Sequence, residues 1–272
     1  MNQTFSGVSA RSLVVTRGGH RVLRGLDLDA SPGSVLGLIG PNGAGKTTLL
    51  AALAGILTID SGSITVAGVP LDNLSARRHS RMVSLMPQDT SITFDTTVRS
   101  LVEVGRHPHR RRFTALDPAR DRLLVDDALD RTGLTSLAEH SVLTLSGGQR
   151  QLAHVARTIA QDTPVVLMDE PVSALDLAHQ IRIFDVIHEI SRSGRTVVLV
   201  LHDLTQASRY CDELLLLNNG EVHGHGTPQD VLTPHHLASV YGVNTAVDLD
   251  PHTSRPRVHA HGLINATGRG CT

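Results

Sequence analysis

The sequence predicts an α/β fold with a parallel central sheet, and three features support this class. Short apolar runs alternate with longer stretches of helical periodicity along most of the chain. Three of the apolar runs lead directly into glycine-rich or polar segments that suit phosphate or metal chemistry. Because ligands bind beyond the carboxyl ends of the strands in an open parallel sheet, we expect these three strand ends to form one site.

The apolar runs predict buried strands, and the periodic stretches predict helices. The strands are expected at residues 35–39, 165–168, 197–201 and 214–217, and the helices at 47–57, 149–161 and 177–191. Alternation over residues 63–69 predicts a half-exposed strand. Residues from about 90 to 162 carry much helical and little strand signal, which predicts a helical subdomain inserted in the α/β core.

Composition excludes several classes of protein. With 40% hydrophobic and 19% charged residues among 272, the chain has the composition of a folded protein. Its formal net charge of −1 does not suggest binding of nucleic acid through bulk positive charge, so we expect no nucleic-acid partner. Two cysteines, Cys211 and Cys271, make a poor disulfide framework and favour a reducing compartment.

The apolar runs are too short for membrane spans. None approaches the roughly 18–20 residues that cross a bilayer, and residues 1–11 lack the apolar core of a secretory signal. If the protein works at a membrane, we therefore expect another chain to provide the spans.

A phosphate-binding loop follows the first of the three strands. Residues Gly40, Pro41, Asn42, Gly43, Ala44, Gly45, Lys46 and Thr47 match the pattern G-x-x-x-x-G-K-[ST], and Thr48 continues into the predicted helix. Glycines let backbone N–H groups wrap a phosphate, and the following helix presents its positive end to it. Lys46, the only lysine in the chain, is expected to reach the β- and γ-phosphates of ATP, and the Thr47 hydroxyl to ligate Mg²⁺. A glycine-rich turn without a ligand is the alternative.

Acids and a histidine end the other two strands. Asp169 and Glu170 follow residues 165–168, and His202 follows residues 197–201. Asp169 is expected to hold Mg²⁺, and Glu170 to orient or deprotonate the attacking water. A pair of solvated acids is the alternative, which the presence of Lys46 disfavours. His202 is placed to sense the γ-phosphate, although a lone histidine at a strand end is more often structural.

Residues 145–149 carry a family resemblance. Leu145-Ser146-Gly147-Gly148-Gln149 resembles the signature of ATP-binding cassette (ABC) proteins, and a serine with two glycines at a helix start forms an anion cradle. The alternative is an N-capped helix after a Gly-Gly turn. The resemblance implies a P-loop NTPase core with an antiparallel β subdomain and an inserted α-helical subdomain. It also implies a homodimer in which each signature closes on the γ-phosphate of the ATP held by the opposite protomer.

Other residues match the ABC family in their expected order. Gln88 resembles the glutamine that touches Mg²⁺ and the water and reports to the membrane partner. Asp176, in the loop of residues 173–176, resembles the aspartate that reaches across the dimer, and His202 resembles the switch histidine. The resemblance covers about residues 10–245. Residues 246–272, rich in Pro, Gly, Thr and His, are expected to form a loosely ordered tail.

The chain departs from the family pattern at two positions. Arg17 stands where an aromatic residue often stacks on adenine, and a guanidinium can also lie flat on a base. We therefore expect Arg17 to contact the adenine. Val172 stands where Thr or Ser is usual after Glu-Pro, and we expect little loss from this change.

A weaker signal points to a subfamily. Gly105-Arg106-His107-Pro108-His109 resembles a short motif of importers for ferric siderophores, haem and cobalamin, and residues 176–180, 232–234 and 240–243 also resemble that group. The resemblance implies an ATP-hydrolysing subunit at the cytoplasmic face of the membrane that energises an importer, first of all for ferric siderophores. It implies permease subunits contacted through the Gln88 region and the helical subdomain, and indirectly an extracytoplasmic solute-binding protein. The choice of cargo rests on analogy, because the ATPase of an importer does not contact the cargo.

Three alternatives to an importer subunit exist. An ABC ATPase acting on DNA needs a long coiled coil, for which too few residues separate Lys46 from Leu145, and a ribosome-acting type usually carries two cassettes. An exporter subunit often has fused spans, although separate-chain exporters exist. A non-hydrolysing scaffold is disfavoured because Lys46, Asp169, Glu170 and His202 are all present.

Two further patterns have simple explanations. The histidine pairs at 107/109, 223/225, 235/236 and 259/261 lack Cys or acidic partners at ligand-like spacing, so we expect them not to bind metal. The run Arg110-Arg111-Arg112 is expected to be a solvated basic turn rather than a site for lipid headgroups or nucleic acid.

Overall fold

The computed structural model of the chain describes residues 7–109, 117–173 and 175–264. The strands are β1 (Val8–Arg17), β2 (His20–Ala30), β3 (Val35–Ile39), β4 (Ser61–Val66), β5 (Val69–Pro70), β6 (Val83–Met86), β7 (Val165–Asp169), β8 (Thr196–Val200), β9 (Glu213–Asn218), β10 (Glu221–Gly226), β11 (Val243–Leu249) and β12 (Pro256–Leu263). The α-helices are α1 (Lys46–Leu53), α2 (Ala76–His79), α3 (Val98–Glu103), α4 (Pro118–Arg131), α5 (Gly147–Ala160), α6 (Leu177–Arg192), α7 (Leu204–Tyr210), α8 (Pro228–Val231) and α9 (Pro234–Tyr241). Arg110, Arg111, Arg112, Ala174 and Cys271 lie outside the described residues.

The central sheet has the strand order β10-β9-β3-β8-β7-β6. Its strands from β9 to β6 are parallel, and β10 pairs antiparallel with β9 at one edge. Every residue of β3, β7 and β8 is buried, which explains why these strands read as continuous apolar runs. The predicted α/β class with a parallel sheet is therefore confirmed.

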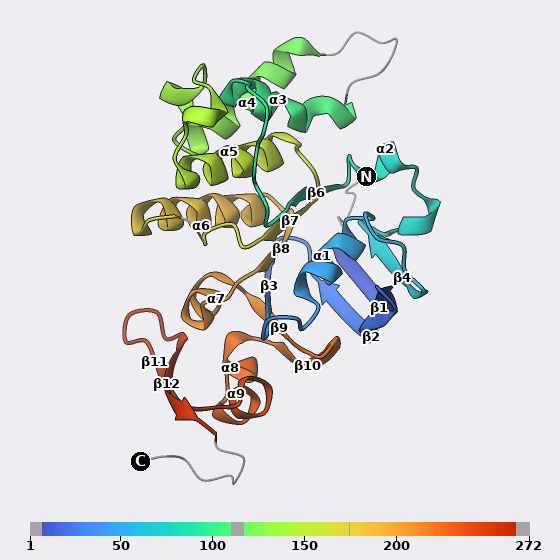
Figure 1. Cartoon of the computed structure of the whole chain (residues 1–272), viewed down its shortest axis with the longest axis vertical. Coiled ribbons are helices and arrows are strands. Elements are labelled where there is room, and N and C mark those ends of the chain that lie inside the picture. Colours follow the sequence, from blue (N-terminus) through green and yellow to red (C-terminus); the bar gives the residue numbers. More distant parts are fainter. Residues whose placement is uncertain (1–6, 110–116, 174, 265–272) are drawn as a thin grey trace.

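A second, antiparallel sheet has the order β2-β1-β4-β5 and lies beside the central one (Figure 1). Leu13 and Leu26 of this sheet share one apolar core with Leu49 of α1 and with Leu38 and Leu215 of the central sheet. The two sheets thus hold α1 between them. The expected antiparallel β subdomain is confirmed, and the predicted strand at 63–69 divides into β4 and β5.

Between β6 and β7 every described regular element is helical. Helices α3, α4 and α5 lie together at one end of the molecule (Figure 1), around a core that includes Leu101, Val125, Leu129, Leu152 and Val155. The predicted helical subdomain is confirmed. Within the part of the chain that the structure describes, no helix is long and apolar enough to cross a membrane.

The motif at residues 105–109 is an internal brace of this helical subdomain. The buried Arg106 guanidinium pairs with Asp121 of α4 at 2.9 Å and donates to the carbonyl of Ala160 at 2.7 Å. His109 contacts the carbonyl of Gln161 at 2.7 Å. A Cβ on Gly105 would lie 2.3 Å from the Arg157 carbonyl oxygen, so only glycine fits against α5 there.

The expectation that residues 246–272 are loosely ordered is wrong for residues 246–264. Strands β11 and β12 form an antiparallel hairpin that includes most of these residues. Val247 and Val258 pack against the core, Arg257 pairs with Asp248 at 3.1 Å, and the Asp250 carboxylate accepts two backbone N–H groups of the turn. A reading from composition missed this hairpin because its apolar residues are few and its stability comes from pairing and packing.

Helix α1 is shorter than predicted. It ends at Leu53 rather than at residue 57, because the chain turns through Gly55, whose φ is +63°. A left-handed glycine directly after the last helical turn is a common way for a helix to end.

Replacement of Arg106 by Ala is expected to destabilise the protein by about 3–5 kcal/mol, the usual cost of breaking a buried ion pair on one side. Urea titration followed by circular dichroism measures the loss. Arg99→Ala is the matched control, because Arg99 makes two ion pairs whose acidic partners are largely exposed. We expect about 1 kcal/mol or less from it. Equal losses would show that Arg106 does not brace the subdomain.

His154 of α5 gives a pH-dependent prediction. Its ring is buried, and neither ring nitrogen has a hydrogen-bond partner among the described residues. Burial, reinforced by Arg157, lowers the pKa of His154 to about 4. Because the folded pKa lies below the unfolded one, the folded state disfavours protonation, and stability is lost as the pH falls from about 6.5 towards 4.

The His154→Gln variant tests this linkage, since an amide does not titrate in that range. The wild type should lose about 3 kcal/mol more than the variant between pH 7 and pH 4. Denaturant midpoints at both pH values measure the difference. Parallel losses in the two proteins would contradict the assignment.

Candidate nucleotide site

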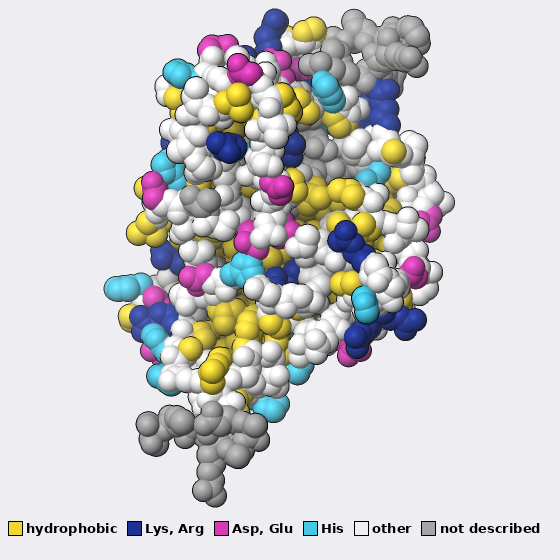
Figure 2. All heavy atoms as spheres, viewed as in Figure 1, with side chains coloured by type: hydrophobic (Ala, Val, Ile, Leu, Met, Phe, Trp, Pro, Cys, Tyr) yellow, Lys and Arg dark blue, Asp and Glu magenta, His cyan; other side chains and the backbone are white. Residues whose placement is uncertain are grey.

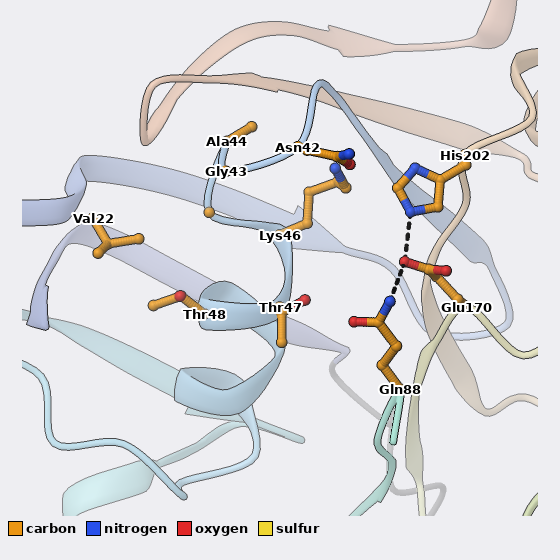
Figure 3. A pocket seen from close by; sticks show the side chains of 11 residues that line it. Val22, Asn42, Gly43, Ala44, Lys46, Thr47, Thr48, Gln88, Glu170 and His202 are labelled. Atoms are coloured by element: carbon orange, nitrogen blue, oxygen red, sulfur yellow. Dashed lines mark hydrogen bonds and ion pairs between the residues drawn. The ribbon is translucent and has the colours of Figure 1, made fainter. Parts of the chain in front are cut away.

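The carboxyl ends of β3, β7 and β8 border a cavity of about 740 Å³ (Figure 3). The cavity is lined by Val22, Asn42, Gly43, Ala44, Gly45, Lys46, Thr47, Thr48, Gln88, Glu170 and His202. The structure therefore brings together the groups that follow three separate strands.

The phosphate loop joins β3 to α1 and turns tightly at its glycines. Gly40 has a φ of +144°, and a Cβ there would lie 2.2 Å from the Leu217 carbonyl oxygen of β9. Gly45 precedes α1 with a φ of +104°. The first turn of α1 thus adjoins the cavity, and its free N–H groups and helix dipole favour an anion there.

Lys46 crosses the base of this loop. Its Nζ donates to the carbonyl oxygens of Gly40 at 2.7 Å and Pro41 at 2.9 Å. Burial lowers the pKa of the Lys46 ammonium, whereas the nearby Glu170 and Asp169 carboxylates raise it. The ammonium is therefore held at the loop by backbone carbonyls and is stabilised by the charges of the two acids at the end of β7.

Asp169 is the last residue of β7 and is 2% exposed. Burial raises the pKa of its carboxyl, and the neighbouring Thr47 hydroxyl lowers it. Its Oδ1 has no hydrogen-bond partner among the described side chains and backbone. A buried carboxylate oxygen left unpaired beside a hydroxyl fits a hard cation, which prefers oxygen ligands.

Glu170, Gln88 and His202 form a connected set at the cavity wall (Figure 3). The Oε1 atom of Glu170 accepts a hydrogen bond from the Gln88 amide at 2.9 Å and contacts Nε2 of His202 at 2.5 Å. The Glu170 backbone is left-handed, with a φ of +54°. This geometry aims one carboxylate into the cavity and holds it by an amide and an imidazole from two other segments.

The signature residues lie outside this cavity. Ser146 caps α5: its hydroxyl accepts the Gln149 N–H, and the Gln149 side chain accepts the Ser146 N–H. Gly147 is exposed, with open space where a Cβ would be, and Gly148 follows it in the first turn. Within a single chain these residues do not reach the groups of the nucleotide cavity.

Asp176 also lies outside the cavity and is exposed. Its carboxylate caps α6 by accepting the backbone N–H of His179 at 3.0 Å and contacts the His179 ring at 2.8 Å. These hydrogen bonds lower the pKa of Asp176.

Arg17 is not among the described residues that line the cavity. It ends β1 and is exposed, whereas Val22 of β2 forms part of the cavity wall. Sequence reasoning missed Val22, because an apolar residue in an amphipathic strand gives no signal of its own. It also missed Gln151, whose amide donates to the Glu170 carbonyl and whose signal is a polar residue on the buried face of α5.

The histidines do not assemble a metal centre in residues 7–109, 117–173 and 175–264, where no group of three His, Cys, Asp or Glu is placed to hold an ion. The visible histidines are spread over the surface (Figure 2). His223 contacts the Ser239 hydroxyl at 2.8 Å, and His236 contacts the Val231 carbonyl at 3.0 Å. These rings therefore have local hydrogen-bonding roles.

A strand–loop–helix phosphate site, with a buried acid and a second carboxylate at the next strand end, defines a nucleoside triphosphatase of the P-loop class. A model of the ABC transporter family matches residues 23–173. The hemin import ATP-binding protein HmuV of Pseudomonas aeruginosa is 41% identical over 254 residues, which cover 92% of this chain and 98% of HmuV. The chain belongs to the ABC transporter family.

Two further comparisons agree. The cobalamin import ATP-binding protein BtuD of Halobacterium salinarum is 43% identical over 242 residues, which cover 89% of this chain. The chain spans 60% of the length of that relative. A chain of a metal-chelate type ABC transporter in an inward-facing conformation matches with a TM-score of 0.79 and 28% identity, covering 94% of this chain and 98% of its own. The resemblance to the ABC family is thus confirmed.

The cavity lining predicts which residue contacts the adenine side of ATP. Val22→Glu should weaken ATP binding about tenfold, or ~1.4 kcal/mol, because a charged group would replace apolar surface at the wall. Arg17→Ala should leave the dissociation constant within about twofold of the wild type. Isothermal titration calorimetry with ATP measures both, and Val22→Thr controls for side-chain shape. If Arg17→Ala weakened ATP binding as much as Val22→Glu does, the adenine ring would contact Arg17 instead.

Proposed function

We propose that this chain is the ATP-binding and ATP-hydrolysing subunit of a membrane importer for a metal chelate, with haem as the first candidate cargo. The observation that carries the ATPase part is the convergence of Lys46, Glu170 and His202 on one cavity, with the buried Asp169 carboxyl interacting with all three. The cargo part is supported by similarity to HmuV over nearly the full length of both chains.

The phosphate loop binds the triphosphate in this proposal. Backbone N–H groups of the loop and of the first turn of α1 surround the phosphates, and Lys46 adds a positive charge from the loop base. The Lys46 ammonium already lies against the loop carbonyls, so a phosphate oxygen in the cavity exchanges places with one of these acceptors.

Glu170 acts as the general base. Its carboxylate borders the cavity and is oriented by the Gln88 amide and the His202 ring. A water between the γ-phosphate and Glu170 loses its proton to this carboxylate as it attacks. His202 is placed to donate a hydrogen bond to the charge that develops on the phosphate.

The residues present also fit Mg²⁺. The Thr47 hydroxyl, the unpaired Asp169 oxygen and the Gln88 side-chain oxygen are the groups that would hold it. The ion would neutralise negative charge on the phosphate oxygens when bound.

The dimer and the permease contact belong to the same proposal. The signature has Ser146 and Gly147 exposed and Gly148 and Gln149 half-buried. It suits an anion cradle for the γ-phosphate bound by a second copy, with Asp176 at the same interface. The loop after Gln88 carries Phe94, which is 62% exposed, and the partly buried Ile92. An apolar side chain next to the catalytic glutamine and the helical subdomain suits contact with permease subunits at the cytoplasmic face of the membrane, and through them indirectly with an extracytoplasmic solute-binding protein.

The named relatives import hemin and cobalamin. They offer no direct support for a ferric siderophore, which the sequence motifs favoured. Haem ranks first because the match with HmuV covers 92% of this chain and 98% of HmuV, whereas this chain spans only 60% of BtuD.

The test is uptake by cells whose own copy of the gene is replaced. Hemin, cobalamin and an iron-loaded siderophore are supplied separately to cells that express the wild type, Glu170→Gln or Glu213→Gln at matched levels. Glu213 is the control glutamate, because it pairs with His225 on β9 and β10, away from the cavity. Hemin uptake should be lost only with Glu170→Gln.

Any other outcome of the uptake and hydrolysis measurements would revise one part of the proposal. Loss of cobalamin or siderophore uptake alone would reassign the cargo. Equal uptake of all three with Glu170→Gln and the wild type would reject the importer assignment for these cargoes. ATP hydrolysis by the purified Glu170→Gln variant at the wild-type rate would reject Glu170 as the base.

A further inference from the structure

Gln151 connects the signature helix to the catalytic carboxylate of the same chain. It lies on α5, is 6% exposed, and its Nε2 donates to the backbone carbonyl oxygen of Glu170 at 2.8 Å. Gln151 is not part of the phosphate loop, of the signature residues 145–149 or of the described cavity lining.

The hydrogen bond falls on a backbone unit whose conformation is unfavourable. Glu170 has a φ of +54°, a left-handed conformation that is unfavourable for a residue with a side chain. Among the described residues, its carbonyl otherwise receives only longer contacts from Ser173, at 3.2 Å from the hydroxyl and 3.4 Å from the backbone N–H. Of these contacts, the hydrogen bond from the Gln151 amide is the shortest.

This backbone turn fixes the direction in which the Glu170 carboxylate points. With the backbone of Glu170 held, its Oε1 meets the Gln88 amide at 2.9 Å and the His202 ring at 2.5 Å. Rotation about the N–Cα bond of Glu170 would move its carbonyl and its side chain together, away from these partners. A change of a fraction of an ångström at a general base is enough to slow proton transfer.

Gln151 stands little more than one helical turn from Ser146, the cap at the start of α5. Helix α5 is buried on nearly all sides from Gln151 to Ala160, where its apolar residues belong to one continuous core. A shift of the helix start therefore reaches the Glu170 carbonyl through a single side chain.

We propose that Gln151 is a positioning residue for the general base. Its amide holds the Glu170 backbone in the left-handed turn, and this hydrogen bond couples the position of the signature helix α5 to the rate of ATP hydrolysis. The inference rests on the ATPase activity and is independent of the cargo. A simple packing role for Gln151 would predict lower stability without a specific kinetic signature.

The experiment uses the full chain and two near-isosteric variants, Gln151→Met and Gln151→Glu. Gln151→Met removes the donor at every pH. The carboxyl introduced by Gln151→Glu has no proton to donate when ionised but donates one when protonated, and burial raises the pKa of such a carboxyl towards neutrality. The steady-state rate is measured against ATP concentration from pH 8 to pH 6, and each variant is divided by the wild type at the same pH.

We expect Gln151→Met to lower kcat by about 10–100-fold with KM for ATP within about twofold, because a lost positioning contact acts on the transition state. Gln151→Glu should be similarly slow at pH 8, and its ratio to the wild type should rise several-fold by pH 6. The ratio for Gln151→Met should stay level across the same range.

Gln161→Met is the matched control. Gln161 lies at the end of the same helix and likewise donates to buried backbone, at 2.7 Å to Ser80 and 3.1 Å to Val83. It should lower the melting temperature but leave kcat within about twofold, since it does not contact the site. The proposal is overturned by an equal fall of kcat in Gln161→Met, by parallel pH ratios for the two Gln151 variants, or by a rise in KM that accounts for the loss.

Discussion

The site depends on the register of the parallel strands β3, β8 and β7, which places their carboxyl ends at the same height in the sheet. Val200 of β8 lies opposite both Leu38 of β3 and Asp169 of β7, so the three strands end together at one edge of the sheet. The next residues along each strand are then the phosphate loop, Glu170 and His202. Because these strands are buried on both faces, a slipped register would move apolar side chains and break the ladder at once.

The carboxyl ends of these strands bring together buried charges that would destabilise the protein anywhere else in the core. Lys46 and Asp169 are both buried. Burial lowers the pKa of Lys46 and raises the pKa of Asp169, and the charge of each residue opposes the shift of the other. The unpaired oxygen of Asp169 adds to the cost. Such a set of groups is tolerated where a bound anion and its counter-ion complete the hydrogen bonding, which is why the same residues favour ligand binding over stability.

The sequence predicted the parts of the site that local pattern controls. A glycine-rich loop after an apolar run, or acids after another, can be recognised without knowing the fold, because strand, turn and helix start are contiguous. Arg17 and Val22 show the limit: β1 and β2 pair with register shifts near Val15 and Thr16, so the residue facing the cavity depends on a bulge. The β11–β12 hairpin and the contact of Gln151 with Glu170 were hidden for a related reason, since both arise from pairing or packing of residues that no short pattern links.

The subfamily motif shows why the cargo is hard to read from this subunit. Gly105, Arg106 and His109 all turn inward and tie η2 (Val104–His109) to α4 and to the end of α5. None of them is placed to meet a transported solute. These residues hold the helical subdomain in shape. A resemblance at this motif therefore reflects how the subdomain packs and carries no direct information on cargo.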